Sequence, residues 1–320
     1  MKDGLAEAAE RLSVRQLRTI AAIDDHGSIR LAADNLNITQ PTATKALKEA
    51  ERILGVELFT RTNRGVIPTG YGTALCRRAR LILAELRHAG EEIRDLKEGH
   101  GGRVVVGTLL AASARLLPTA IARLRRDRPK VSLSVVEGTN DVLMPSLRLG
   151  DLDLVVGRLP EYRGREGTTQ ETLYDEMTCL AVRPGHPLLS SADIKLTDIL
   201  SWGLIVPPQE TTLRRQLEKS FHDAGLDLPS IVIESVSVLT NRQLAMQSDI
   251  ISAWPYQVIR QDILDGKLCR LPVSLPQASR PVGLTLRASH DPSPAAAALI
   301  AALRIVASEI RDEGATELIF

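Results

Sequence analysis

Apolar residues recur at helical spacing near the start of the chain, and they predict two short helices in succession. The positions that share one face after Gly27 are Ile29, Ala32, Ala33 and Leu36. Ser28 precedes them and is a good N-cap residue, so we expect a helix to begin there. The two adjacent alanines leave little side chain on that face, which allows a second helix to approach closely.

The second helix is predicted to follow a turn at Asn37-Ile38. Thr39 is a suitable N-cap, and Pro41 is tolerated because first-turn amides have no intrahelical partners. The predicted buried stripe consists of Ala43, Ala46, Leu47, Ala50, Ile53 and Leu54. A tight turn and a polar start to the second helix are typical of a helix-turn-helix that enters the DNA major groove. The polar residues with side chains able to reach base edges are Gln40, Thr42, Thr44, Lys45 and Lys48.

Two short apolar segments flank Thr62-Asn63-Arg64-Gly65, and this pattern predicts a β-hairpin. A hairpin here would be the wing of a winged helix-turn-helix, which we expect over residues 13–72. Arg61 and Arg64 would then lie beside the duplex, where they can hold phosphates or enter the minor groove. The alternative is a generic three-helix domain with basic residues facing solvent.

One long helix is predicted over residues 73–98. Its apolar or small residues alternate at spacings of four and three, at Leu75, Ala79, Ile82, Leu86, Ala89, Ile93 and Leu96. This is the heptad seam of a coiled coil. The seam could instead pack on the protein's own domain. We favour dimerisation, because the helix lies between two predicted domains and helix-turn-helix proteins usually read twofold half-sites as dimers.

The pattern changes after the predicted long helix. Gly99, Gly101 and Gly102 interrupt it and predict a hinge. From Arg103 onward, apolar strands alternate with helices, which predicts an α/β domain with a mostly parallel sheet. Such strands are predicted at Val104–Val106, Val131–Val136, Leu152–Val156 and Leu204–Val206.

Composition and charge fit this division. At 320 residues the chain suits two or three domains, and with 3% aromatic residues its cores must be aliphatic. Between Arg11 and Arg80, twelve Lys and Arg oppose six Asp and Glu, a net +6; the whole chain is +1, so the remainder is −5. A basic head on an acidic body is common among nucleic-acid binders. The chain shows no membrane-length apolar run and no apolar signal core, so we expect a cytoplasmic protein without membrane contact.

Candidate enzyme chemistry is absent from the sequence. No nucleophile elbow, P-loop or dinucleotide fingerprint occurs. The three cysteines are scattered and the six histidines lack metal-ligand spacing, so we expect no metal and no cofactor. The rival classes are a metabolite-sensing protein that does not bind DNA and a solute-binding transport protein. The basic helix and wing argue against the first, and the lack of a signal peptide argues against the second.

Specific motifs accompany the predicted head between Leu17 and Gly72. They are Gly27-Ser28, Ala32-Ala33-Asp34-Asn35-Leu36, Thr39-Gln40-Pro41, Thr44, Glu51, Leu54-Gly55, Leu58-Phe59-Thr60-Arg61, Thr69 and Gly72. In these the chain resembles the LysR-type transcriptional regulators. It departs from them at Ile29, where phenylalanine is usual, at Ala50, where leucine is usual, and at Thr44, where serine is common. The resemblance implies DNA contacts from Gln40, Pro41, Thr44 and Lys45 on the helix and from Arg61 and Arg64 on the wing. The full set of predicted DNA-binding residues is Ser28, Thr39, Gln40, Pro41, Thr42, Thr44, Lys45, Lys48, Arg61 and Arg64.

The body from Gly102 to Phe320 resembles the effector domain of the same family, which is similar to type 2 periplasmic binding proteins. This implies an effector-binding domain over 103–320 with two α/β lobes. The expected lobes are 103–172 with 277–320, and 173–276, and the expected crossovers lie near Glu171-Thr172 and Pro276-Gln277. The resemblance also implies a homodimer paired through the linker helix, often assembled further into a homotetramer, that acts on promoter DNA, with RNA polymerase as a further partner.

Small ligands of such folds bind in the cleft where strand ends and helix N-termini point inward. Thr139, Arg158, Thr211 and Thr212 correspond to positions that line the family's cleft. The family often has a hydroxyl residue at the first helix start, but here Ala111 and Ala112 stand in that region and Ser113 comes later. The predicted effector-binding residues are Thr108, Ser113, Thr139, Asn140, Arg158, Thr211, Thr212 and Arg214.

Resemblance to one subgroup of the family indicates the chemical class of the inducer. Gly150–Leu159, Thr211–Arg214 and Ser248-Asp249 look similar to regulators of galactose-binding-protein and protocatechuate operons. A sugar would suit stacking on Trp202 or Trp254, although a Trp is more often part of the core. An aromatic carboxylate would suit Arg158 or Arg214. We favour a sugar or sugar acid as inducer, with an aromatic carboxylate as the alternative.

Overall fold

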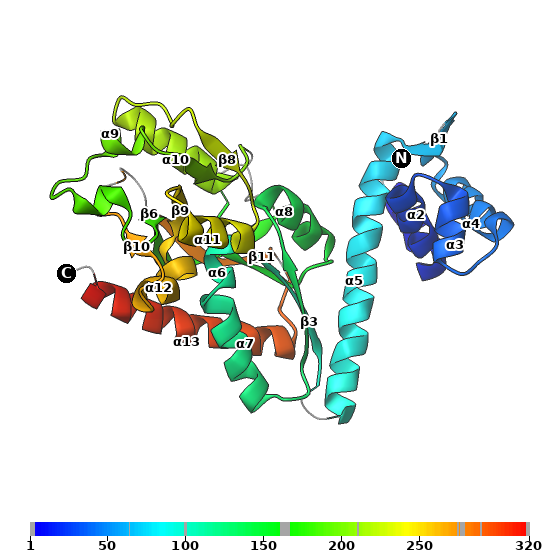
Figure 1. The fold of residues 1–320 in the computed structure, drawn as a ribbon. Coiled ribbons are helices and arrows are strands. Elements are labelled where there is room, and N and C mark those ends of the chain that lie inside the picture. Colours follow the sequence, from blue (N-terminus) through cyan, green and yellow to red (C-terminus); the bar gives the residue numbers. More distant parts are fainter. Residues whose placement is uncertain are drawn as a thin grey trace. The chain divides into compact units, whose positions relative to one another are not determined.

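The computed structural model describes residues 4–63, 65–98, 101–160, 167–209, 211–273, 275, 279–288 and 290–317 (Figure 1). The chain divides into two compact units. The first comprises Met1–Gly102 and Pro145–Leu152, and the second comprises Arg103–Met144 and Asp153–Phe320. Each unit has its own hydrophobic core, so each is described by itself.

The first unit begins with a small helical head and a hairpin. Its elements are α1 (Gly4–Glu10), α2 (Val14–His26), α3 (Ile29–Asn35), α4 (Gln40–Leu54), β1 (Phe59–Thr62) and β2 (Gly65–Pro68). The paired Ala32 and Ala33 are fully buried where α3 meets its neighbours, and Ile20 and Ile23 of α2 fill the same core. The two adjacent alanines therefore allow the helices to pack closely, as the sequence predicted.

Local side chains begin and end these helices. Ser28 caps α3 and accepts a hydrogen bond from the Leu31 amide, and Thr39 caps α4 by accepting one from the Thr42 amide. Both caps agree with the sequence prediction. The turn between the two helices passes through Asn37, whose φ of 53° is in the left-handed region that Asn tolerates well.

Helix α5 (Gly70–Glu98) leaves the head as one continuous helix. Its first turns belong to the head, since Cys76 and Ala79 are buried and Leu75 packs against the same core. Further along, Ile82, Leu86 and Ile93 are 45%, 49% and 67% exposed. The heptad seam thus serves two purposes: its start completes the head, and its continuation presents apolar side chains to solvent.

The second unit is built on a mixed sheet with strand order β4-β3-β5-β11-β6-β9-β7-β8, and β10 pairs with β6. Strand pairs β3/β4, β3/β5, β7/β8 and β7/β9 are parallel, while β11 and β6 run antiparallel to their neighbours. The strands are β3 (Arg103–Thr108), β4 (Ser132–Glu137), β5 (Leu154–Arg158), β6 (Thr168–Val182), β7 (Leu204–Val206), β8 (Val232–Glu234), β9 (Ile251–Pro255), β10 (Cys269–Arg270) and β11 (Ser279–Arg287). The helices are α6 (Leu110–Ser113), α7 (Leu116–Asp127), α8 (Asn140–Leu149), α9 (Leu196–Ile199), α10 (Thr212–Asp223), α11 (Val238–Gln247), α12 (Tyr256–Leu264) and α13 (Pro294–Glu317).

The two largest hydrophobic cores of this unit mark its two lobes. Val106 and Leu299 belong to the first core, which α7 and α13 cover, and Val206 and Phe221 belong to the second. Strand β6 joins the lobes, because its residues through Met177 pair with β11 and those from Thr178 pair with β9.

The first expected crossover, near Glu171-Thr172, falls within strand β6. Leu173 and Tyr174 pack in the first core, so β6 leaves that lobe after Tyr174. The second expected crossover, at Pro276-Gln277, lies outside the described residues. No helix in the described part of the chain is long and apolar enough to span a bilayer.

Candidate DNA-binding surface and effector cleft

Helix α4 presents a shallow polar groove on its exposed side. Ala43, Leu47 and Ala50 face the core, so the intervening positions face solvent. The groove is lined by Gln40, Pro41, Thr44, Lys45, Lys48, Glu49 and Arg52. Five of the predicted DNA-binding residues therefore share one surface, with Gln40 at the first turn of the helix.

The groove also contains an ion pair that the sequence analysis did not single out. Arg52 donates to Glu49 through two nitrogens, at 2.6 and 3.0 Å. This hydrogen-bonded contact lowers the pKa of Glu49 and holds its negative charge beside Lys45 and Lys48. The i, i+3 spacing of the pair on a helix was the available signal. Glu49 is thus an acid within an otherwise basic surface, where its negative charge would repel an anionic partner.

The remaining polar residues at the helix starts act within the protein. The Ser28 hydroxyl caps α3, and the hydroxyls of Thr39 and Thr42 lie 2.8 Å apart at the start of α4. These three residues fall outside the groove lining. Their first role is to fix where the two helices begin.

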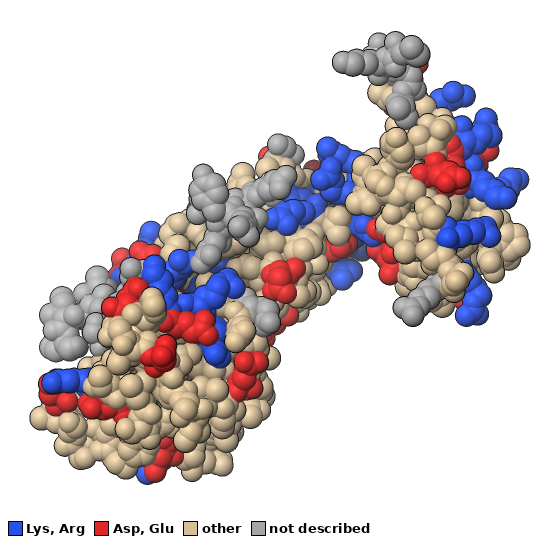
Figure 2. All heavy atoms as spheres, turned by 90° about the horizontal axis from the view of Figure 1, so that it is seen from above, with Lys and Arg blue, Asp and Glu red and all other residues tan. Residues whose placement is uncertain are grey.

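The wing is joined to the head through backbone atoms. The Val66 amide donates to the Gly27 carbonyl oxygen at 2.9 Å. Gly65 has φ of 140°, and a Cβ there would lie 2.2 Å from the same oxygen, so only glycine fits this contact. Arg61 is exposed on β1, while Arg64 lies outside the described residues. Figure 2 shows Lys and Arg side chains spread over the exposed surface of the head.

The second unit contains a cleft of about 560 Å³ between its lobes. Strands β5, β7 and β9 end at this cleft, and helices α8, α10 and α11 begin there, which is where α/β folds bind small molecules. Five predicted effector-binding residues line it: Thr139, Asn140, Arg158, Thr211 and Thr212. The volume is in the usual range for a small-molecule site.

Three other predicted effector-binding residues are placed away from the lining. Thr108 is buried at the end of β3 and donates to the Leu109 carbonyl, and Ser113 donates to the Leu110 carbonyl. Arg214 is buried and pairs with Glu218 at 2.6 Å within α10. The helical spacing of Arg214 and Glu218 explains the difference, because it turns the guanidinium along its own helix.

Arg158 is the most constrained polar residue of the cleft. It is 5% exposed, its Nη2 donates to Thr178 Oγ1 at 2.7 Å, and its Nη1 donates to Gln216. Burial lowers its pKa to about 10, while the nearby charge of Glu176 opposes that shift. Arg158 therefore remains a cation near neutral pH. Through Thr178 and Gln216 it also connects strand β5 of the first lobe to β6 and α10 of the second.

Several lining residues had no signal in the sequence. They include Val142, Arg215, Ser235, Val236 and Asn241. Asn241 stands on α11, whose weak amphipathic pattern did not reveal which side faces a cleft. Trp254 is nearly fully buried and donates to Ser252, so it is mainly a core residue at the floor of the cleft. Trp202 instead contacts the ring of His186 and packs in the core of the second lobe.

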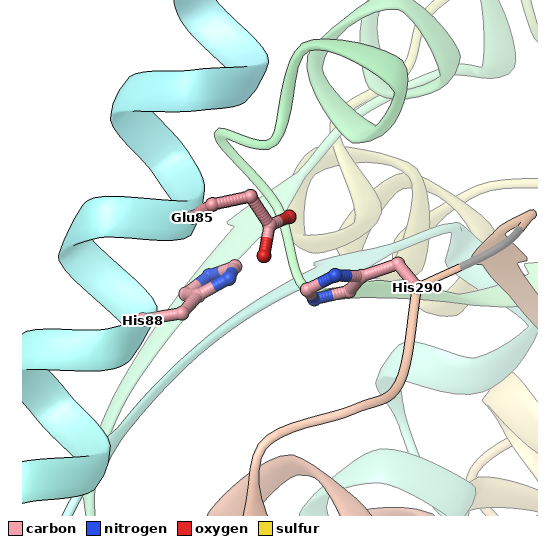
Figure 3. Close-up of side chains that lie close together, drawn as sticks. All are labelled: Glu85, His88 and His290. Carbon is pink, nitrogen blue, oxygen red and sulfur yellow. The ribbon is translucent and has the colours of Figure 1, made fainter.

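Three side chains that could ligate a metal are Glu85, His88 and His290. Figure 3 shows Glu85 and His88 on neighbouring turns of α5, and His290 before α13. His290 belongs to the second unit, whereas the other two residues belong to the first. We therefore assign no metal site to these residues.

Comparison with known proteins identifies the families of both domains. Residues 14–73 match the bacterial regulatory helix-turn-helix proteins of the lysR family, and residues 97–308 match the LysR substrate binding domain. The HTH-type transcriptional regulator GbpR of Azospirillum brasilense is 33% identical over 309 residues, covering 96% of this chain and 90% of that protein. PcaQ of Agrobacterium fabrum, also an HTH-type transcriptional regulator, is 34% identical over 308 residues, covering 96% and 99%.

A solved structure shows the same fold over nearly the whole chain. A full-length OxyR variant from Pseudomonas aeruginosa has a TM-score of 0.68 at 24% identity and covers 92% of this chain and 95% of its own. The predicted winged helix-turn-helix and two-lobed α/β body are therefore confirmed. With matches to both domain families and close relatives along its length, the chain belongs to the LysR family of DNA-binding transcription regulators.

Proposed function

We propose that this regulator recognises promoter DNA through the α4 groove and the β1–β2 wing, and that a small inducer in the cleft of the second unit controls it. The observation that carries the proposal is the cleft itself. It is large enough for a small metabolite, and its lining includes the buried polar side chains Arg158 and Asn241. Buried polar groups normally have partners, so such a lining is expected to meet a polar ligand.

The inducer we favour is a sugar or sugar acid, with an aromatic carboxylate as the alternative. Hydroxyl groups of a sugar would meet Asn140, Thr139 and Thr211 along the lining. Stacking now depends on Trp254 alone, because Trp202 lies in the core of the second lobe. The cation of Arg158 suits the acid forms of either class.

The regulator would act as a homodimer, and further as a tetramer. The exposed positions Ile82, Leu86 and Ile93 on α5 support pairing, since they lie on one seam at heptad spacing. Apolar side chains on such a seam are buried when two helices coil together. RNA polymerase is a further proposed partner, inferred only from action at promoters.

The test of this function is selection of DNA from a random pool by the full-length protein. We expect one enriched sequence with two related half-sites, and an inducer that changes the affinity or footprint on it. A Lys45→Ala, Lys48→Ala double variant should lose the enrichment. The matched control is Arg126→Ala, an exposed cation on α7 that is not in the groove. Failure of the native protein to enrich any sequence would support a metabolite-sensing protein without DNA binding.

A further inference from the structure

The cleft offers both a hydrogen-bond donor and acceptors without partners. Arg158 Nε is buried and makes no hydrogen bond, although the other two nitrogens of the guanidinium are engaged. Asn241 is 9% exposed; its Nδ2 donates to the Ser235 carbonyl at 3.3 Å, and its Oδ1 has no partner. Asn140 Oδ1 is also buried and has no hydrogen-bond partner. A ligand that satisfies all three must accept near Arg158 and donate to the two amides, as a hydroxylated acid does.

The starts of two helices favour a negative charge in the same cleft. Helix α10 begins at Thr212 and helix α11 at Val238, and both residues line the cleft. The N-terminal end of a helix carries a partial positive charge and unpaired amides. Two acids, Glu137 and Asp141, line the cleft and both are exposed. Because solvent screens their charge, they compensate the positive charge of Arg158 less than a buried acid would.

A buried acid lies behind Arg158 at the junction of the lobes. Glu176 on β6 is 1% exposed, and the Gln257 amide at the start of α12 donates to its Oε1 at 2.9 Å. Burial raises the pKa of Glu176 to about 7, against the opposing influence of that hydrogen bond and of Arg158. The charged state of this carboxyl therefore changes near neutral pH, and it compensates Arg158 only when ionised.

The other titratable groups near Arg158 and Glu176 do not supply a negative charge that compensates Arg158. Arg115 is bonded to Gln257 and paired with Glu313 at 2.6 Å, which already engages that acid. Burial raises the pKa of Tyr174 and of Cys179, so both stay neutral. The titratable and charged groups around Glu176 are Arg158 on β5, Tyr174 and Cys179 on β6, Arg115 before α7, Arg280 on β11 and Tyr256 at the start of α12. Beyond them, Glu313 on α13 pairs with Arg115 and with Arg260 of α12.

We propose that the cleft binds a small hydroxylated carboxylate whose negative charge compensates Arg158, and that Glu176 takes up a proton when this ligand binds. Two anions beside one buried cation leave an excess charge in a poorly solvated site. Protonating Glu176 removes that excess and leaves the ligand's carboxylate as the counter-charge. A neutral sugar has no such linkage. The inference rests on the proposed function and narrows its inducer from a sugar or an acid to an acid.

The test is calorimetric titration of the full-length protein with two matched pairs of compounds. The pairs are D-galactonate with D-galactose, and 3,4-dihydroxybenzoate with 1,2-dihydroxybenzene. Titrations at about pH 6, 7 and 8, each in buffers of low and high ionisation enthalpy, count the protons taken up. We expect an acid to bind at least about tenfold more tightly than its neutral counterpart, with affinity falling up to about tenfold per pH unit above pH 7.

Two variants locate the effect. Glu176→Gln mimics the protonated carboxyl, so it should bind the acid without proton uptake and without pH dependence. Arg158→Gln should lose most of the acid affinity, while Arg126→Gln on α7 should keep it. Because proton uptake is measured on the native protein, the test does not depend on whether either variant folds.

The outcomes separate this inference from the proposed function. Acid binding without proton uptake, a neutral compound that binds as tightly as its acid, or no binding of either acid would overturn the inference. In the second case the cleft would still be an inducer site. DNA binding that no cleft ligand alters would instead overturn the proposed control by an inducer.

Discussion

The amide nitrogen of Val66 lies 2.9 Å from the carbonyl oxygen of Gly27, so the wing is attached to the turn that ends α2. This hydrogen bond joins the hairpin to the helix-turn-helix without using any side chain. The position of the wing relative to α2 therefore depends on a close backbone approach, and the residue most exposed to a change there is the neighbouring glycine, Gly65.

Replacing Gly65 by alanine should weaken DNA binding. The added Cβ would lie 2.2 Å from the Gly27 oxygen, so the hairpin must move away from the head. We expect at least about a tenfold loss of DNA affinity and about 1–2 kcal/mol of stability, from the strained φ and the clash. Gly55→Ala is the control, because Gly55 also has a positive φ, of 69°, but no atom lies within 4 Å of the added Cβ. Equal DNA affinities in fluorescence anisotropy would contradict this role of the contact.

Replacing Glu49 by glutamine should strengthen DNA binding. The substitution removes an acid from the α4 groove and releases Arg52 from its ion pair. The net charge of the groove rises by one unit, and the Arg52 guanidinium becomes free to meet a duplex phosphate. The dependence of log affinity on log salt should steepen by about one unit, whereas Lys45→Ala should flatten it by about one. A slope unchanged in both variants would show that this helix face does not meet phosphates.

Replacing Leu86 by glutamate should dissociate the dimer. Leu86 is 49% exposed on α5 and lies on the seam with Ile82 and Ile93, where a charge would be buried between helices. The weight-average mass in sedimentation equilibrium should fall toward that of a monomer. Arg94→Glu, which places the same charge on the outside of the helix, should leave the mass unchanged. If the two variants sediment alike, another surface holds the subunits together.

Replacing Glu176 by glutamine should change how stability varies with pH. Burial raises the pKa of Glu176 in the folded protein to about 7, from an ordinary value near 4.5. The folded state thus keeps a proton that the unfolded chain releases, so this group's contribution is full below about pH 4.5 and is lost as pH rises to 7. Glu176→Gln should remove that decline. Thermal unfolding from about pH 5 to 8 would detect it, and parallel curves for both proteins would contradict the assignment.

The helical head was predictable because its signals are local. Ser28 and Thr39 each accept a hydrogen bond from an amide three residues further along the chain. Ala32 and Ala33 lie at helical spacing with larger apolar residues, and this spacing indicates which side of the helix is buried. The same holds for the strand–helix alternation of the body. Where a helix starts and which side it buries are determined by neighbours in sequence.

The cleft was only partly predictable because its residues come from distant segments. Thr211 and Arg158 follow predicted strands, so their strand ends revealed them. Arg214 follows the same strand as Thr211, but its pairing with Glu218 turns it away from the lining. Glu176 gave no signal, because its environment is created by a contact with the Gln257 amide, 81 residues further along the chain. Asn241 gave none because the weak amphipathic pattern of α11 does not show which side the helix buries. Long-range packing, rather than local pattern, decides which polar side chains meet.

Helix α5 determines the direction in which its exposed seam points as well as the distance of the seam from the head. Ala79 is buried and Ile82 begins the exposed seam, and both residues lie on one continuous helix. Each residue of an α-helix turns the chain by about 100°. Inserting or deleting a single residue between these positions would rotate every later seam position relative to the head. Related chains should therefore tolerate changes of residue type in this short stretch far better than changes of its length, since its length determines how a pair of heads faces the two half-sites of an operator.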